Sequence, residues 1–339
     1  MNIIELIGNT PLVELRRLNP ADGRVQLYGK LESSNPGGSI KDRVALSMVE
    51  AGERSGELTQ DKILLEATSG NTGIGMAMMC AAKRYRCQLI MPESASIERR
   101  LIMQAYGAEI ILTPAKRKTD VAIEKAYALA REFPERYFLA DQFNNPANWQ
   151  AHYTTTAPEI WAQTEGRVTD IVTTLGTSGT AMGLSRWFRE HHPEVRVIAV
   201  EPYPGHKIQG LKNMKESYRP GIFDKTLPHA IVNVADEDAF SAARRLAAEE
   251  GVFAGMSSGA ALFAAIERAR ELDRGCIVAI LPDGGERYLS TTLFKPQQQA
   301  EPEVSQLKLF NTMSRRKEVF RPLHPDRVTL YACGPTAFT

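Results

Sequence analysis

The fold is indicated most clearly by the stretch Lys62-Ile63-Leu64-Leu65-Glu66-Ala67-Thr68-Ser69-Gly70-Asn71-Thr72-Gly73. Residues 62–67 form a short apolar run typical of a buried strand, the turn after it is rich in glycine and hydroxyl groups, and residues 74–83 have a helical pattern. Similar strand patterns occur at 88–91, 109–112, 170–175, 196–201 and 276–281, and helical patterns at 119–132 and 236–250. Apolar strands that alternate with helices predict an α/β fold with mostly parallel sheets flanked by helices.

The bulk properties are those of an ordinary soluble protein. The 339 residues are 43% hydrophobic and 24% charged, with a net charge of +1, which gives no electrostatic reason to expect nucleic acid or an anionic membrane as a partner. No run approaches the roughly 18 apolar residues of a membrane span, and the N-terminus lacks the pattern of a secretory signal, so we expect a cytoplasmic protein. Cysteines 80, 87, 276 and 333 form no C-x-x-C pair, which predicts neither a disulfide framework nor a metal site.

A second turn contains the candidate nucleophile. In Asn35-Pro36-Gly37-Gly38-Ser39-Ile40-Lys41-Asp42-Arg43, a tight turn is expected to bring Ser39 to the start of a helix and to place Lys41 in its first turn. The positive end of the helix dipole disfavours an ammonium there, so we expect a lowered pKa for Lys41 and a nucleophilic amine. Most lysines are solvated surface charges, and the glycine-rich approach is what sets this one apart.

Two further turns have the composition of ligand cradles. Residues 68–73 offer hydroxyl and amide donors without charge, which suits a carboxylate at a helix N-terminus, although a simple capped turn has the same composition. Gly176-Thr177-Ser178-Gly179-Thr180 follows a strand and suits a phosphate, but it has neither the lysine of a Walker loop nor the dinucleotide pattern. A phosphate cradle, an activated lysine and a carboxylate loop together fit pyridoxal phosphate with an amino-acid substrate.

Residues 6–292 resemble the cysteine synthase family of pyridoxal-phosphate enzymes, the two-domain fold-type II group related to the β-subunit of tryptophan synthase. Six motifs in register carry the resemblance, at 7–12, 36–43, 68–73, 141–143, 176–180 and 255–259. The runs at 152–156, 220–223 and 287–291 are similar to the B-type isoenzyme. The family is usually homodimeric, and we expect a homodimer by analogy.

The resemblance implies a role for each motif. Lys41 would bind the cofactor aldehyde covalently as a Schiff base and act as the general base. The other cofactor-binding residues would be Asn71, Gly176, Thr177, Ser178, Gly179, Thr180 and Ser257, with Asn71 at the phenolic oxygen and Ser257 at the pyridine nitrogen. The substrate α-carboxylate would bind Thr68, Ser69, Thr72 and Gln142.

The implied reaction is the replacement of the acetate of O-acetyl-L-serine by sulfide, which yields L-cysteine. Thiosulfate, which would yield S-sulfocysteine, is a less certain donor, because residues 211–215 keep only part of the positive charge of the B-type and Pro282 replaces a cysteine. The alternatives are a cystathionine β-synthase, an O-phosphoserine sulfhydrylase, a serine dehydratase, and a non-catalytic scaffold that binds serine acetyltransferase.

The domain organisation expected is a catalytic core at 1–295, a linker at 296–306 and a tail at 307–339. Within the core we expect a smaller mobile domain at about 40–145 and a larger domain formed by 1–39 and 146–295. The tail resembles the opening of cysteinyl-tRNA synthetase, in which the cysteine at position 333 would be a zinc ligand. Because a single cysteine cannot build a tetrahedral zinc site, we expect no aminoacylation.

Overall fold

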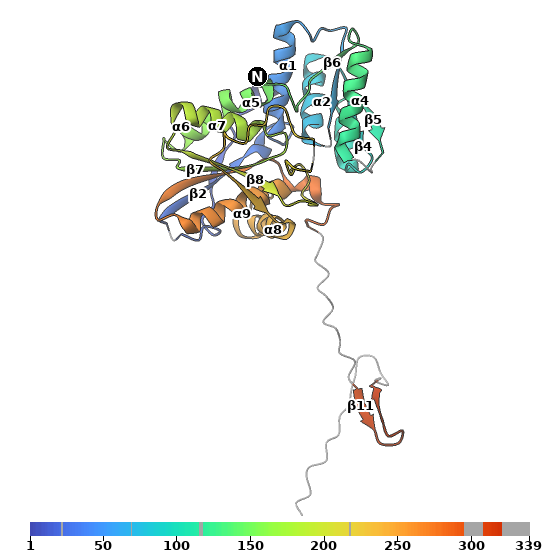
Figure 1. Cartoon of the computed structure of the whole chain (residues 1–339), viewed down its shortest axis with the longest axis vertical. Helices are drawn as coiled ribbons and strands as arrows, with labels where there is room; N and C mark the ends of the chain where they lie inside the picture. Colours follow the sequence, from blue (N-terminus) through green and yellow to red (C-terminus); the bar gives the residue numbers. More distant parts are fainter. Residues whose placement is uncertain (22, 69, 115–117, 217, 295–307, 321–339) are drawn as a thin grey trace, which may run out of the picture. The chain divides into compact units, whose positions relative to one another are not determined.

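The computed structural model describes residues 1–21, 23–68, 70–114, 118–216, 218–294 and 308–320 (Figure 1). Met1–Phe294 form one compact unit, and Lys295–Thr339 form a second unit. Within the first unit the strands group into two sheets, one of six strands and one of four.

The six-stranded sheet has the order β1-β2-β10-β7-β8-β9 and is parallel except for its first strand. Its strands are β1 (Leu12–Glu14), β2 (Val25–Leu31), β7 (Asp170–Thr174), β8 (Arg196–Pro202), β9 (Ala230–Val234) and β10 (Gly275–Leu281). Side chains alternate along β10: Ile277 packs in one core cluster and Val278 in another. The sheet is therefore buried on both faces, as parallel sheets are.

Helices cover both faces of this sheet. On the Ile277 face lie α8 (Asp236–Glu250) and α9 (Met256–Glu271), which are seen next to the sheet in Figure 1. On the Val278 face lie α6 (Ala157–Gln163) and α7 (Gly179–His191).

The four-stranded sheet is wholly parallel and has the order β5-β4-β3-β6. Its strands are β3 (Ile63–Ala67), β4 (Arg86–Pro92), β5 (Glu109–Thr113) and β6 (Tyr137–Leu139). One face packs against α1 (Lys41–Ser55), α2 (Asn71–Lys83) and α3 (Ile97–Ala105), and the other against α4 (Lys118–Glu132). Short helical segments complete the unit: η1 (Ile3–Leu6), η2 (Glu32–Ser34), α5 (Ala147–Ala151), the π-helical turn η4 (His152–Thr156) and η5 (Gly285–Tyr288).

The predicted α/β class is confirmed, and each strand and helix expected from the sequence is present with bounds that shift by at most three residues. The largest shift is at α2, which begins at Asn71, directly after Gly70, rather than at residue 74. The elements that the patterns did not predict include β1, β2, β6, β9, α3, α5, α6 and η4. The four-stranded sheet lies within the range predicted for a smaller domain, whose boundaries and mobility stay predictions.

The second unit contains one antiparallel hairpin among its described residues, with strands β11 (Lys308–Asn311) and β12 (Arg316–Val319). Every residue of both strands is exposed. The predicted linker and Cys333 lie outside the described residues. Within the described ranges, no helix combines the length and the apolar character needed to cross a membrane.

Candidate functional site

A cavity of about 100 Å³ lies where turns of the two sheets meet. Of the residues predicted from the sequence, the cavity brings together Lys41, Thr68, Asn71, Thr72, Gln142, Gly176, Thr177, Thr180 and Ser257. Ser178 and Gly179 belong to the same turn as Gly176 without lining the cavity, and Ser69 lies outside the described residues. Turns separated by more than 200 residues in sequence thus form one site.

Lys41 is the first residue of α1, and so lies in the first turn of the helix as the sequence predicted. The Ser39 hydroxyl accepts a hydrogen bond from the Lys41 backbone N–H at 3.2 Å, which marks the start of the helix. Burial lowers the pKa of Lys41, although the nearby carboxylates of Asp283 and Glu32 oppose that shift. The direction is the one expected, but its largest cause is desolvation, a tertiary effect, whereas the sequence pointed to the helix dipole.

The turn before Lys41 is held by its own side chains. Gly38 has a φ of +80°, which favours glycine, and its N–H donates to the Asn35 carbonyl at 2.7 Å. The Asp42 carboxylate accepts from the Gly37 N–H at 2.6 Å. One residue further, the buried Arg43 pairs with Glu32 at 2.8 Å. These contacts fix the backbone on both sides of Lys41.

The turn 176–180 has the features of an anion cradle. Met182 makes the first backbone hydrogen bond of α7, to the Ser178 carbonyl, so the N–H groups before it have no partner within the helix. Ser178 adopts a φ of +69°, and its buried hydroxyl has no hydrogen-bond partner among the described residues. A Cβ atom at Gly176 would overlap the Gly210 carbonyl, and one at Gly179 would overlap the Asn148 side chain. Both positions therefore require glycine.

His152 contacts the turn 176–180 through Thr180. Its Nε2 lies 3.2 Å from the Thr180 hydroxyl, and its Nδ1 lies 2.9 Å from the Thr156 hydroxyl. Burial, with help from Lys41 and Arg43, holds the pKa of His152 well below its usual value, so the ring is neutral. The sequence singled out this position only as part of a run that resembles one isoenzyme. Its contact with Thr180 is a tertiary feature that no local sequence pattern predicts.

Asn71 is fixed between two charged side chains. Its amide nitrogen donates to Asp283 at 2.6 Å, and its amide oxygen accepts from Arg287 at 2.6 Å. The second N–H of the Asn71 amide is left for the cavity, which Asn71 lines. Tyr288 also donates to Asp283 at 2.6 Å, and the other carboxylate oxygen of Asp283 is buried without a partner among the described residues.

Sequence reasoning missed Asp283 and Arg287 as site residues. A usable signal was present, because residues 283–285 form a glycine-containing turn directly after the apolar strand 276–281, as do the two turns that were recognised. Asp283 is 1% exposed, and only a folded chain reveals its proximity to Lys41.

The predicted carboxylate loop is buried, and some of its hydrogen-bonding groups bind one another. The Thr68 hydroxyl accepts from the backbone N–H groups of Gly70 and Gly73, at 3.2 and 3.1 Å. The Thr72 hydroxyl donates to the Gln142 side-chain oxygen at 2.7 Å. The backbone N–H groups of Asn71 and Thr72, the first two of α2, have no partner within the helix. They are the donors that a carboxylate could use.

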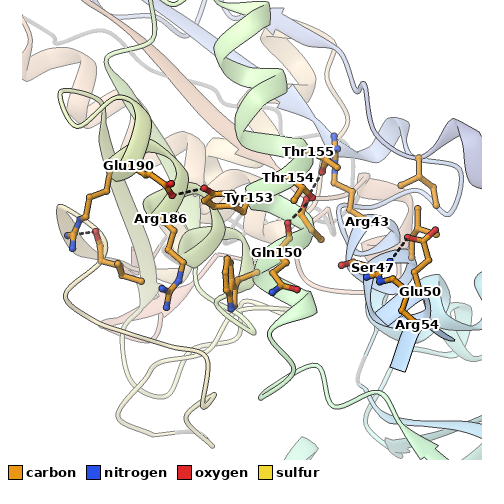
Figure 2. A pocket seen from close by; sticks show the side chains of 16 residues that line it. Arg43, Ser47, Glu50, Arg54, Gln150, Tyr153, Thr154, Thr155, Arg186 and Glu190 are labelled. Atoms are coloured by element: carbon orange, nitrogen blue, oxygen red, sulfur yellow. Dashed lines mark hydrogen bonds and ion pairs between the residues drawn. The ribbon is translucent and has the colours of Figure 1, made fainter. Parts of the chain in front are cut away.

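A larger groove of about 870 Å³ lies apart from these residues (Figure 2). Figure 2 shows Arg43, Glu50 and Arg54 on one side and Tyr153, Arg186 and Glu190 on the other, with the Tyr153 hydroxyl donating to Glu190 at 2.6 Å. Its lining contains none of the predicted site residues. The smaller cavity is therefore the candidate site, because the predicted site residues line it and none of them lines the larger groove.

Comparisons with known proteins identify the family of this chain. The chain matches the family described as "Pyridoxal-phosphate dependent enzyme" over residues 3–283. A cysteine synthase of Aquifex aeolicus is 48% identical over 299 residues, which cover 86% of this chain and 91% of that protein. Cysteine synthase B of Salmonella typhimurium is 46% identical over 295 residues, covering 87% and 96%. The crystal structure of an O-ureido-L-serine synthase has a TM-score of 0.82 and 40% identity, covering 89% of this chain and 97% of that one.

Proposed function

Because this chain belongs to the family of pyridoxal-phosphate dependent enzymes, we propose that its cavity performs the cysteine synthase reaction, in which sulfide replaces the acetate of O-acetyl-L-serine. The observation that carries the proposal is the position of Lys41. An amine whose pKa is lowered by burial lies in the same cavity as an anion cradle and a neutral carboxylate loop. A cofactor with an aldehyde and a phosphate requires the first two features, and an amino-acid substrate requires the third.

The residues present fit pyridoxal phosphate. The buried Ser178 hydroxyl without a partner and the obligatory glycines at 176 and 179 describe a turn shaped for a phosphate. Lys41 would hold the aldehyde, Asn71 the phenolic oxygen and Ser257 the pyridine nitrogen. Ser257 lies in the first turn of α9 and lines the cavity. When bound, the cofactor supplies an electron sink that stabilises negative charge at the substrate Cα and so assists departure of the acetate from Cβ.

Lys41 moves the proton in this reaction. Its lowered pKa favours the free amine, so Nζ can take the proton from the substrate Cα and return it after sulfide has joined Cβ. His152 is held neutral, and the side chain at position 257 is an uncharged serine. A neutral partner at the pyridine nitrogen gives a weaker electron sink than an aspartate would, which favours β-elimination over transamination or racemisation.

The substrate α-carboxylate would bind at the loop that contains Thr68, Ser69 and Thr72, with Gln142 beside it. The donors there are uncharged, and α2 adds the positive end of its dipole. We propose that this contact brings the smaller domain, at about 40–145, toward the rest of the core. Such closure would exclude water from the reacting atoms.

The sulfur donor has a second candidate. Two basic residues, Arg99 and Lys212, line the cavity and favour an anionic donor such as thiosulfate beside sulfide. Burial lowers the pKa of Lys212, and a bound dianion would restore its charged form. Substitution of Lys212 by Met is expected to raise the KM for thiosulfate and to leave the KM for sulfide unchanged. An equal effect on both donors would reject the candidate.

The test of the main proposal is a spectrum of the purified protein during titration with O-acetylserine, with and without sulfide. We expect a cofactor absorbance in the visible or near-ultraviolet that changes on titration, and cysteine as the product only when sulfide is present. Pyruvate without added sulfide would indicate a serine dehydratase, and turnover of O-phosphoserine or homocysteine would indicate the other two enzymes. A protein that stays colourless with added pyridoxal phosphate would contradict the proposal.

We further propose that the enzyme is a cytoplasmic homodimer, with serine acetyltransferase as a candidate partner. The support is the usual state of this family. Light scattering should give twice the mass of one chain, and a mass equal to one chain would contradict the dimer. A scaffold without catalysis would bind the acetyltransferase yet release no cysteine from O-acetylserine and sulfide.

A further inference from the structure

Glu66 is a buried acid for which the reaction described above gives no role. It is the fourth residue of β3, directly before the carboxylate loop, and it is 1% exposed. Buried carboxylates normally pair with a cation. Among the described residues Glu66 takes part in no ion pair, and all the groups that bind it are neutral N–H donors.

These donors belong to the chain on either side of the loop. One carboxylate oxygen accepts from the Ala67 N–H at 2.9 Å and from the Gln142 side chain at 3.4 Å. The other oxygen accepts from the Gln142 backbone N–H at 3.1 Å. Glu66 therefore holds Gln142, which is 76 residues away in the sequence, through both its backbone and its side chain.

This arrangement leaves Gln142 without a free donor. Its amide nitrogen donates to the Ala67 carbonyl at 2.6 Å and to Glu66, which are as many bonds as an NH₂ group makes. Its amide oxygen points the other way and accepts from the Thr72 hydroxyl. Gln142 thus presents no N–H to a substrate carboxylate. Instead, Gln142 fixes the Thr72 side chain in the first turn of α2, and both Asn71 and Thr72 of that turn line the cavity.

We propose that Glu66 is a positioning residue for the substrate carboxylate: it sets the orientation of Gln142, and through Gln142 and Thr72 it fixes the helix start that binds the anion. Gln142 then orients the loop and does not itself contact the substrate carboxylate. This inference rests on the proposed function, because it takes the α-carboxylate of an amino acid to be the ligand of this loop.

The charge of Glu66 gives the proposal a distinctive readout. Burial raises the pKa of Glu66 to about 8, although the bonds from Gln142 and Ala67 favour the ionised form, and the charge of Asp141 raises it further. The titratable groups that face Glu66 in the described structure are Asp141, on the loop after β6, and Cys87, on β4. Below this pH the acid is neutral. Above it, a negative charge lies behind the helix start and opposes the substrate carboxylate.

The experiment measures the dissociation constant of L-serine for the holoenzyme by calorimetry, from pH about 6.5 to about 9.5. L-Serine has the carboxylate and the amine of the substrate but lacks the acetate leaving group. The amine of serine titrates identically with every protein, so the ratio of the wild-type constant to that of Glu66→Gln isolates residue 66. We expect this ratio to rise about tenfold as the pH increases across the range. In wild type the ionised Glu66 repels the serine carboxylate, whereas the neutral glutamine of the variant does not.

Three further measurements separate positioning from general structure. Glu66→Ala should weaken serine binding about tenfold at low pH, where charge plays no part, because it removes the acceptor that orients Gln142. The cofactor absorbance should stay unchanged, since Lys41 is not touched, and the loss of activity should appear chiefly as a higher KM for O-acetylserine. Glu109→Gln is the matched control, because it makes the same change at an exposed position of the edge strand β5 in the same sheet, and its ratio to wild type should be constant with pH.

A wild-type to Glu66→Gln ratio that stays constant with pH, while wild type binds serine, overturns this inference alone. If the wild-type holoenzyme does not bind serine at all, the proposed function fails and the inference fails with it. If Glu66→Ala does not fold, the pH series with Glu66→Gln still decides the matter.

Discussion

The ion cluster beside the start of α1 allows a quantitative prediction about stability. Glu159 on α6 lies 2.7 Å from the Lys30 amine and 2.6 Å from the Arg43 guanidinium, and its side chain is 13% exposed. Although burial alone would raise the pKa of Glu159, the hydrogen bonds and charges of Arg43 and Lys30 lower it from 4.5 to about 2. A shift of that size corresponds to about 3 kcal/mol of folding free energy.

We expect Glu159→Gln to lower the free energy of unfolding by about 3 kcal/mol at neutral pH. Because the folded-state pKa lies below the unfolded value, the stabilisation by Glu159 is fully present above pH 4.5 and is lost as the pH falls through about 2. The difference between wild type and variant should therefore shrink to about half near pH 3. Urea unfolding followed by tryptophan fluorescence measures both values.

The control is Glu249→Gln, which removes an exposed partner of Arg245 on the surface of α8. Solvent screens such a pair, so this variant should unfold almost as wild type does. An equal loss of stability in the two variants, or a Glu159→Gln effect that does not change between pH 7 and pH about 3, would refute the reasoning.

Three predictions concern the site itself. Lys41→Ala should abolish cysteine formation and the visible or near-ultraviolet cofactor band, and retention of that band would contradict the covalent role of Lys41. Gly179→Ala, whose Cβ would overlap Asn148, should weaken binding of pyridoxal phosphate about a hundredfold by fluorescence titration. Gly56→Ala, with a φ of +74° and open space around it, should lower the melting temperature yet leave that affinity unchanged. Asp283→Ala should release the Asn71 amide and shift the cofactor absorbance maximum, and an unaltered spectrum would argue against its orienting role.

Some features follow from the sequence alone. Local patterns predicted the strand at 62–67, the helix after it and the glycine-rich turn between them, because strand and helix preferences depend on neighbours within a few residues. The placement of Lys41 in the first turn of α1 was predicted in the same way, from a tight turn and a hydroxyl side chain. The order of strand, turn and helix predicted which turns would bind ligands. The chemistry of pyridoxal phosphate followed from three such turns considered together and from the family resemblance.

Other features were decided only by the tertiary structure. The lowered pKa of Lys41 depends on its burial, the fixed amide of Asn71 on Asp283, and the orientation of Gln142 on Glu66. Asn71 and Asp283 are separated by 212 residues, and Glu66 and Gln142 by 76. No periodicity connects residues so far apart. Their contact is created by the order of strands in the sheets, and the exclusion of water that shifts their pKa values exists only once the sheets and helices have packed.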